Sequence, residues 1–225
     1  MPTQTNEFRL SDRTLNLFKG MAIVGVVTFV LGLLIAPHRT LSSFLLVNMG
    51  LLGMGLGAAL FIALQYVCGA HWAVSLRRVP EAMCAVLPWA SAGIMITLIA
   101  GRSLYPWTSE PVVGMKAFFL NYPFFLARAV AFLSIWLLLV RAIVRRSRLQ
   151  DSSGDPALSA SNKRLSAVFL VVFGLTFWMA SFDWVMSLEP EWYSTMYGVY
   201  HFAGLFLGKR PPQPLLTGRL SWRAC

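Results

Sequence analysis

Five apolar stretches, each long enough to cross a lipid bilayer as a helix, constrain this chain more than any other feature of its sequence. A helix needs about 20 residues to cross a hydrocarbon core of about 30 Å. The five stretches are residues 20–36, 44–64, 82–100, 117–140 and 165–182, and a sixth begins at Trp192. Because 57% of the residues are apolar, only 12% are charged and the mean hydropathy is +0.64, a sizeable soluble domain is excluded.

The apolar stretches predict helices rather than the strands of a barrel. They lack alternation of apolar and polar residues, and they are longer than a barrel strand needs to be. A helix also satisfies its backbone hydrogen bonds within one segment, as lipid requires. We therefore expect an all-α, polytopic transmembrane helix bundle with five full spans and a partial sixth. Residues 1–18 would form a cytoplasmic N-terminal segment, 19–207 the bundle with a cytoplasmic loop at 145–163, and 208–225 a divergent basic, proline-rich tail.

The Lys and Arg residues between the spans predict the orientation of the bundle. Those expected on one side are Arg9, Arg13, Lys19, Arg77, Arg78, Arg141, Arg145, Arg146, Arg148, Lys163 and Arg164, and those on the other are Arg39, Arg102 and Lys116. Basic loops stay in the cytoplasm, so the amino terminus should be cytoplasmic. The net charge of +10 then reflects orientation in the lipid bilayer. Nucleic acid is not an expected partner, because no stacking platform accompanies the scattered charges.

Three of the nine acidic residues, Asp183, Glu189 and Glu191, lie close together between the fifth stretch and the sixth, with no basic residue among them. At a membrane edge ionisable groups are costly, which favours a functional role such as a proton or cation route.

A helix from about Trp192 would align Tyr193, Tyr197 and His201 on one face, with His201 about 15 Å from the helix start. Imidazole and phenol groups can exchange protons, so these side chains would extend the route into the membrane. The alternative is that Trp192 and Tyr193 form an interfacial aromatic belt and that His201 is a structural residue.

Arg128 is also expected to lie inside a span, where ionisable residues are rare. Pro123 is a suitable first helical residue, which puts Arg128 about 8 Å into the fourth span from its outer end. Asp183 ends the fifth span on the same side, and we expect the two to pair, since a lone charge in hydrocarbon is penalised. The alternative is that Arg128 extends to the headgroups by itself. On the fifth span Thr176, Ala180, Asp183 and Ser187 share one face, which predicts a polar stripe.

A cytoplasmic cluster of Arg77, Arg78 and Glu81 surrounds the start of the third span. Pro80 suits the first helical position, and Glu81 would interact favourably with the positive end of the helix. That structural role alone explains these residues. A functional interpretation adds that the two arginines bind anionic headgroups or a neighbouring subunit and that Glu81 takes up protons.

The cysteines and histidines predict that this chain binds no metal or redox cofactor of its own. Cys68, Cys84 and Cys225 are scattered and form no Cys-x-x-Cys motif, which argues against iron–sulfur and zinc sites. His38 and His71 fall at opposite ends of their spans, so they cannot ligate one haem together. In the second stretch Gly53, Gly55 and Gly57 would allow another helix to approach closely, although glycine is common in apolar spans generally.

Three segments together resemble one protein family. They are Leu76-Arg77-Arg78-Val79-Pro80-Glu81-Ala82-Met83, Leu120-Asn121-Tyr122-Pro123-Phe124-Phe125-Leu126-Ala127-Arg128, and the run from Phe182 to Tyr200, which is FDWVMSLEPEWYSTMYGVY. Their order and spacing resemble the second polysulfide-reductase-like membrane subunit of bacterial alternative complex III, a quinol:cytochrome c oxidoreductase quinone-binding subunit. The similarity extends from the first span to about Gly204.

The resemblance implies a subunit of the bacterial inner membrane, in a respiratory complex that oxidises quinol. Partner iron–sulfur and multihaem cytochrome subunits, with other membrane subunits, would carry the redox centres, and quinol could bind at an interface with them. Members of the family have ten helices, and after Leu207 this sequence departs from them, so we expect a truncated or frame-shifted product. Asp183, Tyr197 and His201 are the candidates for a quinol-side proton acceptor, because that reaction needs a hydrogen-bonding group that takes the proton.

Two other functional classes remain open from the residues themselves. A small secondary transporter would also hold ionisable groups near the middle of the membrane, but transporters tend to have broken spans in corresponding halves. Here Pro88 interrupts only the third span. The third class is a structural scaffold for neighbouring subunits. The expectation that fits best is a non-catalytic membrane subunit that contributes to a quinol-side or proton-conducting environment.

Overall fold

The computed structural model describes residues 11–70, 76–109, 119–153, 156–189 and 191–207, and these contain helices and no strand. The helices are α1 (Asp12–Ile35), α2 (Pro37–Cys68), α3 (Arg78–Met83), α4 (Leu87–Ala100), α6 (Tyr122–Ser153), α7 (Pro156–Trp184) and α8 (Tyr197–Leu207). Short 3₁₀ turns lie at Cys84–Val86 (η2), Arg102–Leu104 (η3), Pro106–Thr108 (η4) and Met186–Leu188 (η5).

Five segments are long and apolar enough to cross a membrane: Asp12–Ile35, Pro37–Cys68, Arg78–Ala100, Tyr122–Asp151 and Ala157–Leu188. The predicted all-helical bundle with five full spans is therefore confirmed. The predicted sixth span corresponds to α8, which has 11 residues in the described part of the chain. His71 and the segments 1–10 and 208–225 lie outside the described residues.

Helix α2 extends beyond the apolar stretch 44–64 at both ends. Helix α2 begins at Pro37, seven residues before the apolar stretch, because proline suits the first helical position and its missing N–H costs nothing there. It ends just before Gly69, whose φ of 64° is the left-handed conformation that glycine adopts without strain.

The loop expected at 145–163 is largely helical, because α6 continues to Ser153 and α7 begins at Pro156. Arginine, leucine and glutamine are all good helix formers, so the polar character of this segment did not require the helix to end.

The third span is interrupted by the 3₁₀ turn η2 between α3 and α4. Pro88 has no N–H with which to bond the carbonyl of Cys84, so the α-helical ladder cannot pass through this turn. The tighter 3₁₀ geometry takes its place.

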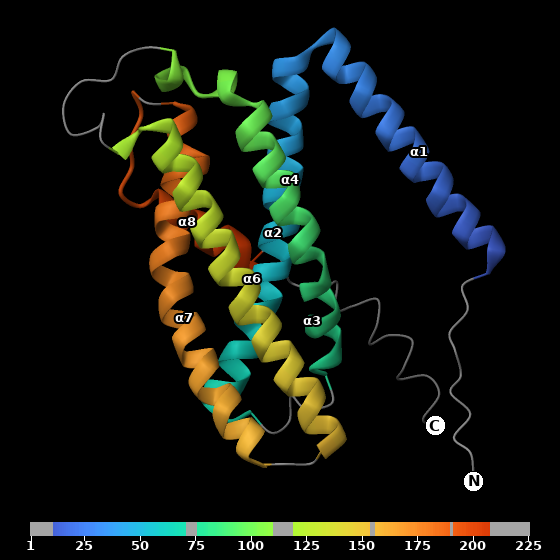
Figure 1. The fold of residues 1–225 in the computed structure, drawn as a ribbon, viewed down its shortest axis with the longest axis vertical. Coiled ribbons are helices and arrows are strands. Elements are labelled where there is room, and N and C mark those ends of the chain that lie inside the picture. The colour runs from blue at the N-terminus through green and yellow to red at the C-terminus, as the bar shows by residue number, and fades with distance from the viewer. Residues whose placement is uncertain (1–10, 71–75, 110–118, 154–155, 190, 208–225) are drawn as a thin grey trace.

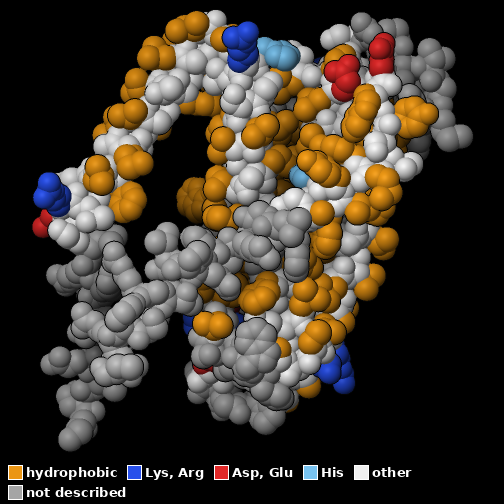
Figure 2. Space-filling model, turned by 180° about the vertical axis from the view of Figure 1, so that it is seen from behind, with side chains coloured by type: hydrophobic (Ala, Val, Ile, Leu, Met, Phe, Trp, Pro, Cys, Tyr) orange, Lys and Arg blue, Asp and Glu red, His pale blue; other side chains and the backbone are white. Residues whose placement is uncertain are grey.

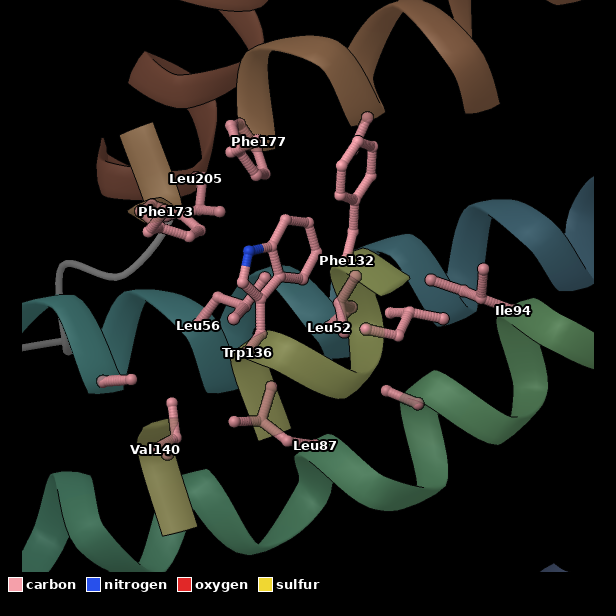
Figure 3. Packing of buried hydrophobic residues seen from close by; sticks show 14 of the residues in the cluster. Leu52, Leu56, Leu87, Ile94, Phe132, Trp136, Val140, Phe173, Phe177 and Leu205 are labelled. Atoms are coloured by element: carbon pink, nitrogen blue, oxygen red, sulfur yellow. The ribbon is translucent and has the colours of Figure 1, made fainter. Parts of the chain in front are cut away.

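The core lies between α2, α4, α6 and α7, with Trp136 of α6 at its centre (Figure 3). The indole is 1% exposed and packs on Phe173, Phe177 and Trp184 of α7 at centroid distances of 5.8, 6.3 and 5.8 Å. Its N–H donates to the Thr176 hydroxyl at 2.8 Å, so the one polar atom of the ring is satisfied.

Helix α1 leans away from the other helices (Figure 1), and none of its residues is buried. Hydrophobic side chains cover much of the surface between the two ends of the molecule in Figure 2. We call the end that carries Glu189 and Glu191 the acidic end and the end that carries Arg141, Arg145 and Arg148 the basic end; α6 runs from the first to the second (Figure 1).

Candidate functional site

The predicted pairing of Arg128 with Asp183 is confirmed and forms the most buried charged contact among the described residues. Arg128 Nε lies 2.8 Å from Asp183 Oδ2, and Arg128 Nη2 lies 2.9 Å from Asp183 Oδ1. The two residues are 7% and 1% exposed. The planar guanidinium thus engages both carboxylate oxygens, the geometry that makes an arginine–carboxylate pair strong and specific.

Loop and aromatic groups complete the surroundings of this ion pair. Arg128 Nη1 donates to the Phe119 carbonyl at 3.0 Å. The guanidinium carbon lies 4.0 Å from the ring centroid of Phe119 and 4.5 Å from that of Phe124. Next to Asp183, the Tyr105 hydroxyl donates to the Trp184 carbonyl at 3.0 Å. Helices α6 and α7 and the loop that follows α4 are therefore held together at the acidic end.

The polar stripe predicted on the fifth span faces α6. Thr176 accepts from Trp136 and Asp183 accepts from Arg128, and both donors belong to α6. Ser187 lies beyond α7 in η5, where its hydroxyl donates to the Asp183 carbonyl.

His201 occupies a separate position between α7 and α8. Its Nδ1 lies 3.0 Å from the Ser181 hydroxyl oxygen, and Ser181 in turn donates to the Phe177 carbonyl at 2.8 Å. The imidazole packs against the rings of Phe177 and Tyr197 at centroid distances of 5.2 and 6.0 Å. Ser181 was not singled out from the sequence, because a serine in an apolar helix usually bonds its own backbone and gives no other signal.

The expected alignment of Tyr193, Tyr197 and His201 is wrong. The final helix begins at Tyr197 instead of Trp192, so Tyr193 lies outside it and is 78% exposed. His201 is then four residues, about 6 Å, from the helix start rather than about 15 Å. Glu189 and Glu191 are also exposed. The acidic residues, the tyrosines and His201 therefore do not form the continuous proton route that the sequence predicted.

Asp183 and His201 are also separated by the helix between them. Ser181, which contacts His201, and Asp183, which contacts Arg128, are two residues apart on α7 and so face different sides. The structure brings Asp183 together with Arg128, and Tyr197 together with His201.

Two cavities flank His201. One of about 450 Å³ lies between α2, α7 and α8, and its lining includes Met49, Phe177, Trp184 and His201. The other, of about 330 Å³, is bordered by Tyr197, Tyr200 and His201. Trp184 carries a buried indole N–H that has no hydrogen-bond partner in the described part of the chain. Both volumes fall within or near the range of small-molecule sites.

At the basic end, Glu81 is 2% exposed and fully paired. Its Oε2 lies 2.6 Å from Arg78 Nη1, and the Ser147 hydroxyl donates to its Oε1. Arg78 also contacts the Asp151 carboxylate. These contacts tie α3 to α6 and support the structural role; proton uptake by Glu81 remains a prediction.

Arg77 makes a different contact. Its Nη1 donates to the Tyr66 hydroxyl at 2.8 Å, and its guanidinium carbon lies 4.4 Å from the Tyr66 ring centroid. Arg77 thus connects the start of the third span to the end of α2. The cytoplasmic cluster predicted from the sequence is a junction of three helices.

Among residues that the structure describes, no three His, Cys, Asp or Glu side chains are close enough to hold a metal ion. The two described cysteines, Cys68 and Cys84, are not joined in a disulfide; one is exposed and the other buried. No protein-family model and no curated protein matches this chain.

Proposed function

We propose that this chain is a membrane subunit of a respiratory quinol:cytochrome c oxidoreductase of the alternative complex III type. In this proposal it has no redox centre of its own. It contributes to the surroundings of a quinol or a proton path and to subunit assembly, in a bacterial inner membrane with a cytoplasmic amino terminus. Iron–sulfur and multihaem cytochrome subunits are its partners.

The observation that carries the proposal is the position of His201 on the wall of an apolar cavity of about 450 Å³. Oxidation of a quinol releases protons, and a nearby imidazole is the side chain best suited to accept them near neutral pH. Phe177 and Trp184 supply apolar and aromatic lining of the kind that ring-shaped ligands favour. The sequence similarity described above points to the same substrate class.

Helix α1 supports a role as one subunit among several. It is 24 residues long and apolar, yet none of its residues is buried within this chain. Such a surface suits contact with lipid or with other membrane helices.

The transporter alternative receives less support from the described spans. Only the third span is broken, at η2, whereas α1, α2, α6 and α7 are each continuous. Transporters of the inverted-repeat kind place such breaks in corresponding positions of two halves.

The proposal is tested by tagging the full chain in its native membrane and purifying it in a mild detergent. We expect multihaem cytochrome and iron–sulfur subunits to co-purify, detected by haem absorption and by electron paramagnetic resonance. Recovery of the chain alone, with solute transport after reconstitution, would contradict the proposal and support a transporter.

Substitution of His201 tests the site itself. In the assembled complex, His201→Phe should lower quinol oxidation by about 10² to 10⁴-fold if the imidazole is the proton acceptor. Tyr193→Phe, on an exposed residue, is the control and should leave the rate unchanged. An unchanged rate in His201→Phe, with normal subunit recovery, would leave only the scaffold role.

A further inference from the structure

A separate cavity lies at the basic end, away from His201, and is not used by the proposed function. It has a volume of about 690 Å³ and runs between α6 and the α3–η2–α4 segment. Figure 1 shows these two segments next to each other at the lower end of the bundle. We call this cavity the basic groove.

One wall of the basic groove carries three arginines of α6. Arg141, Arg145 and Arg148 are spaced by four and three residues, which puts them on one face of the helix, and all three line the groove. Each is exposed, and none forms an ion pair or side-chain hydrogen bond with any residue in the described ranges. Their charges are therefore free to attract an anion.

The one acidic residue that lines the basic groove does not cancel these charges. Glu81 is ion-paired with Arg78 and accepts from Ser147, so its carboxylate is already satisfied. The Asp151 carboxylate is likewise in contact with Arg78. The groove keeps a net positive charge.

The deeper part of the basic groove is apolar. The wall formed by α6 has apolar side chains before and between the arginines, namely Leu137, Leu138, Val140 and Val144. The opposite wall includes Leu87 and Pro88. Because α6 runs toward the basic end, the leucines lie nearer the middle of this helix than Arg145 and Arg148 do. Leu138 is 68% exposed, so the groove is open toward lipid.

We propose that the basic groove binds an anionic phospholipid, with its phosphate on Arg141, Arg145 and Arg148 and an acyl chain along the leucine and valine wall. The groove matches a phospholipid in both charge and polarity. Its arginines would contact the anionic headgroup, and its apolar wall would contact the acyl chain. Arginine also suits phosphate because its planar donors engage two oxygens at once. Basic pockets between membrane helices are suited to anionic headgroups for the same electrostatic reason.

The test uses the delipidated full chain in a non-ionic detergent and counts bound lipids by native mass spectrometry. The two probes are phosphatidylglycerol and phosphatidylcholine with identical acyl chains. We expect one phosphatidylglycerol to bind at least tenfold more tightly than phosphatidylcholine. Equal affinity for the two lipids would overturn the proposal.

Removal of charged side chains distinguishes lipid binding in the basic groove from nonspecific attraction of anionic lipid to a basic protein. Each arginine near an anionic headgroup contributes about fivefold to affinity, so Arg145→Gln should weaken phosphatidylglycerol binding about fivefold. The triple variant R141Q/R145Q/R148Q should lose the preference over phosphatidylcholine. The matched control is R13Q/K163Q/R164Q, which removes the same charge from exposed residues that do not line the groove. Equal losses in the two triple variants would contradict a specific site.

Two further measurements decide the outcome even where the triple variant fails to fold. The single Arg145→Gln change is expected to leave the thermal unfolding temperature unaltered, because the side chain is exposed. Glycerol 3-phosphate, which has the anion without acyl chains, should not displace phosphatidylglycerol at equimolar concentration. Displacement by glycerol 3-phosphate would identify a site for a free anion and overturn the lipid assignment.

Discussion

At the scale of single residues, the Arg128–Asp183 pair shows how this bundle tolerates charge inside an apolar structure. Both groups are at least nine-tenths buried, and Arg128 Nη1 also donates to the Phe119 carbonyl. A buried ion pair of this kind adds little to stability compared with apolar residues, but breaking it is costly. Its contribution is to set the position of α6 relative to α7.

Removal of one partner is expected to destabilise the protein strongly. Asp183→Asn leaves the Arg128 charge without a counter-ion and should lower the free energy of unfolding by about 3–5 kcal/mol. Arg128→Met combined with Asp183→Leu should lower it by much less. Thermal or denaturant unfolding in detergent measures both, with Glu189→Gln as a control on an exposed carboxylate. Equal stability of Asp183→Asn and the parent protein would contradict this role for the pair.

Titration of Tyr105 should lower the stability of the folded protein at alkaline pH. Burial is the main reason that its pKa lies above the usual value, followed by the nearby charges of Asp183 and Tyr122. The folded state then keeps the phenolic proton when the unfolded chain, with a pKa of about 10, has lost it. Stability supplied by neutral Tyr105 is complete below pH of about 10 and declines as the pH rises further.

We expect Tyr105→Phe to cost about 1 kcal/mol at neutral pH, since the hydrogen bond to the Trp184 carbonyl is lost. The difference in stability between Tyr105→Phe and the parent should shrink as the pH rises past about 10, because a phenylalanine side chain has no phenolic proton to release. Unfolding curves across this range test the prediction, and Tyr193→Phe serves as the exposed control. A difference that stays constant with pH would show that Tyr105 does not titrate in this way.

At the scale of elements, glycines decide how closely α2 and α4 pack. A Cβ on Gly93 of α4 would collide with the amide group of Asn48 on α2, and a Cβ on Gly55 of α2 would lie 2.5 Å from Leu87 Cδ2. Asn48 is itself held, because its Nδ2 donates to the Phe44 carbonyl at 2.8 Å. Close approach of two helices in an apolar bundle depends on such small residues.

Gly93→Ala should therefore lower the free energy of unfolding by about 1–3 kcal/mol through overpacking. Gly50→Ala is the matched control on α2, since its Cβ would meet no atom within 4 Å. There the substitution should be neutral or stabilise the helix by about 0.5–1 kcal/mol. Comparison of the two unfolding midpoints in detergent checks the prediction, and a tolerated Gly93→Ala would show that α2 and α4 can move apart at little cost.

At the scale of the whole molecule, stability is concentrated in the four-helix core and not in α1. Ile94 of α4 is 0% exposed, whereas Val27 of α1 is 51% exposed. An apolar side chain that faces lipid or detergent gains little from its position, because its surroundings are equally apolar in both states.

Ile94→Ala should cost about 2–5 kcal/mol by leaving a cavity in the core. Val27→Ala should change the free energy of unfolding by less than about 0.5 kcal/mol. Both values are measured in the same detergent with the isolated chain. A large loss on Val27→Ala would mean that α1 packs against the bundle more closely than Figure 1 shows.

The sequence alone determined the class of fold and several details within it. The thickness of the hydrocarbon core sets the length of a spanning helix, so the five spans could be counted from the apolar stretches of the sequence. An all-helical bundle follows from those stretches. The Arg128–Asp183 pair was also expected from the sequence, because a lone charge in hydrocarbon is costly, but only the structure decided between this pair and an Arg128 that extends to the headgroups. The common face of Arg141, Arg145 and Arg148 was not expected, because residues 145–163 were predicted to form a loop and only the structure continues α6 to Ser153.

Only the tertiary structure decided which of these groups share a site. His201 lies about one turn into α8 because the chain between Trp192 and Tyr197 does not continue as helix, and Tyr193 is left exposed as a result. The contact of His201 with Ser181, and the position of the α6 arginines beside an apolar wall, depend on which faces of neighbouring helices meet. Helical periodicity places residues on a face of one helix, but the packing of side chains across helices selects the neighbour that this face contacts.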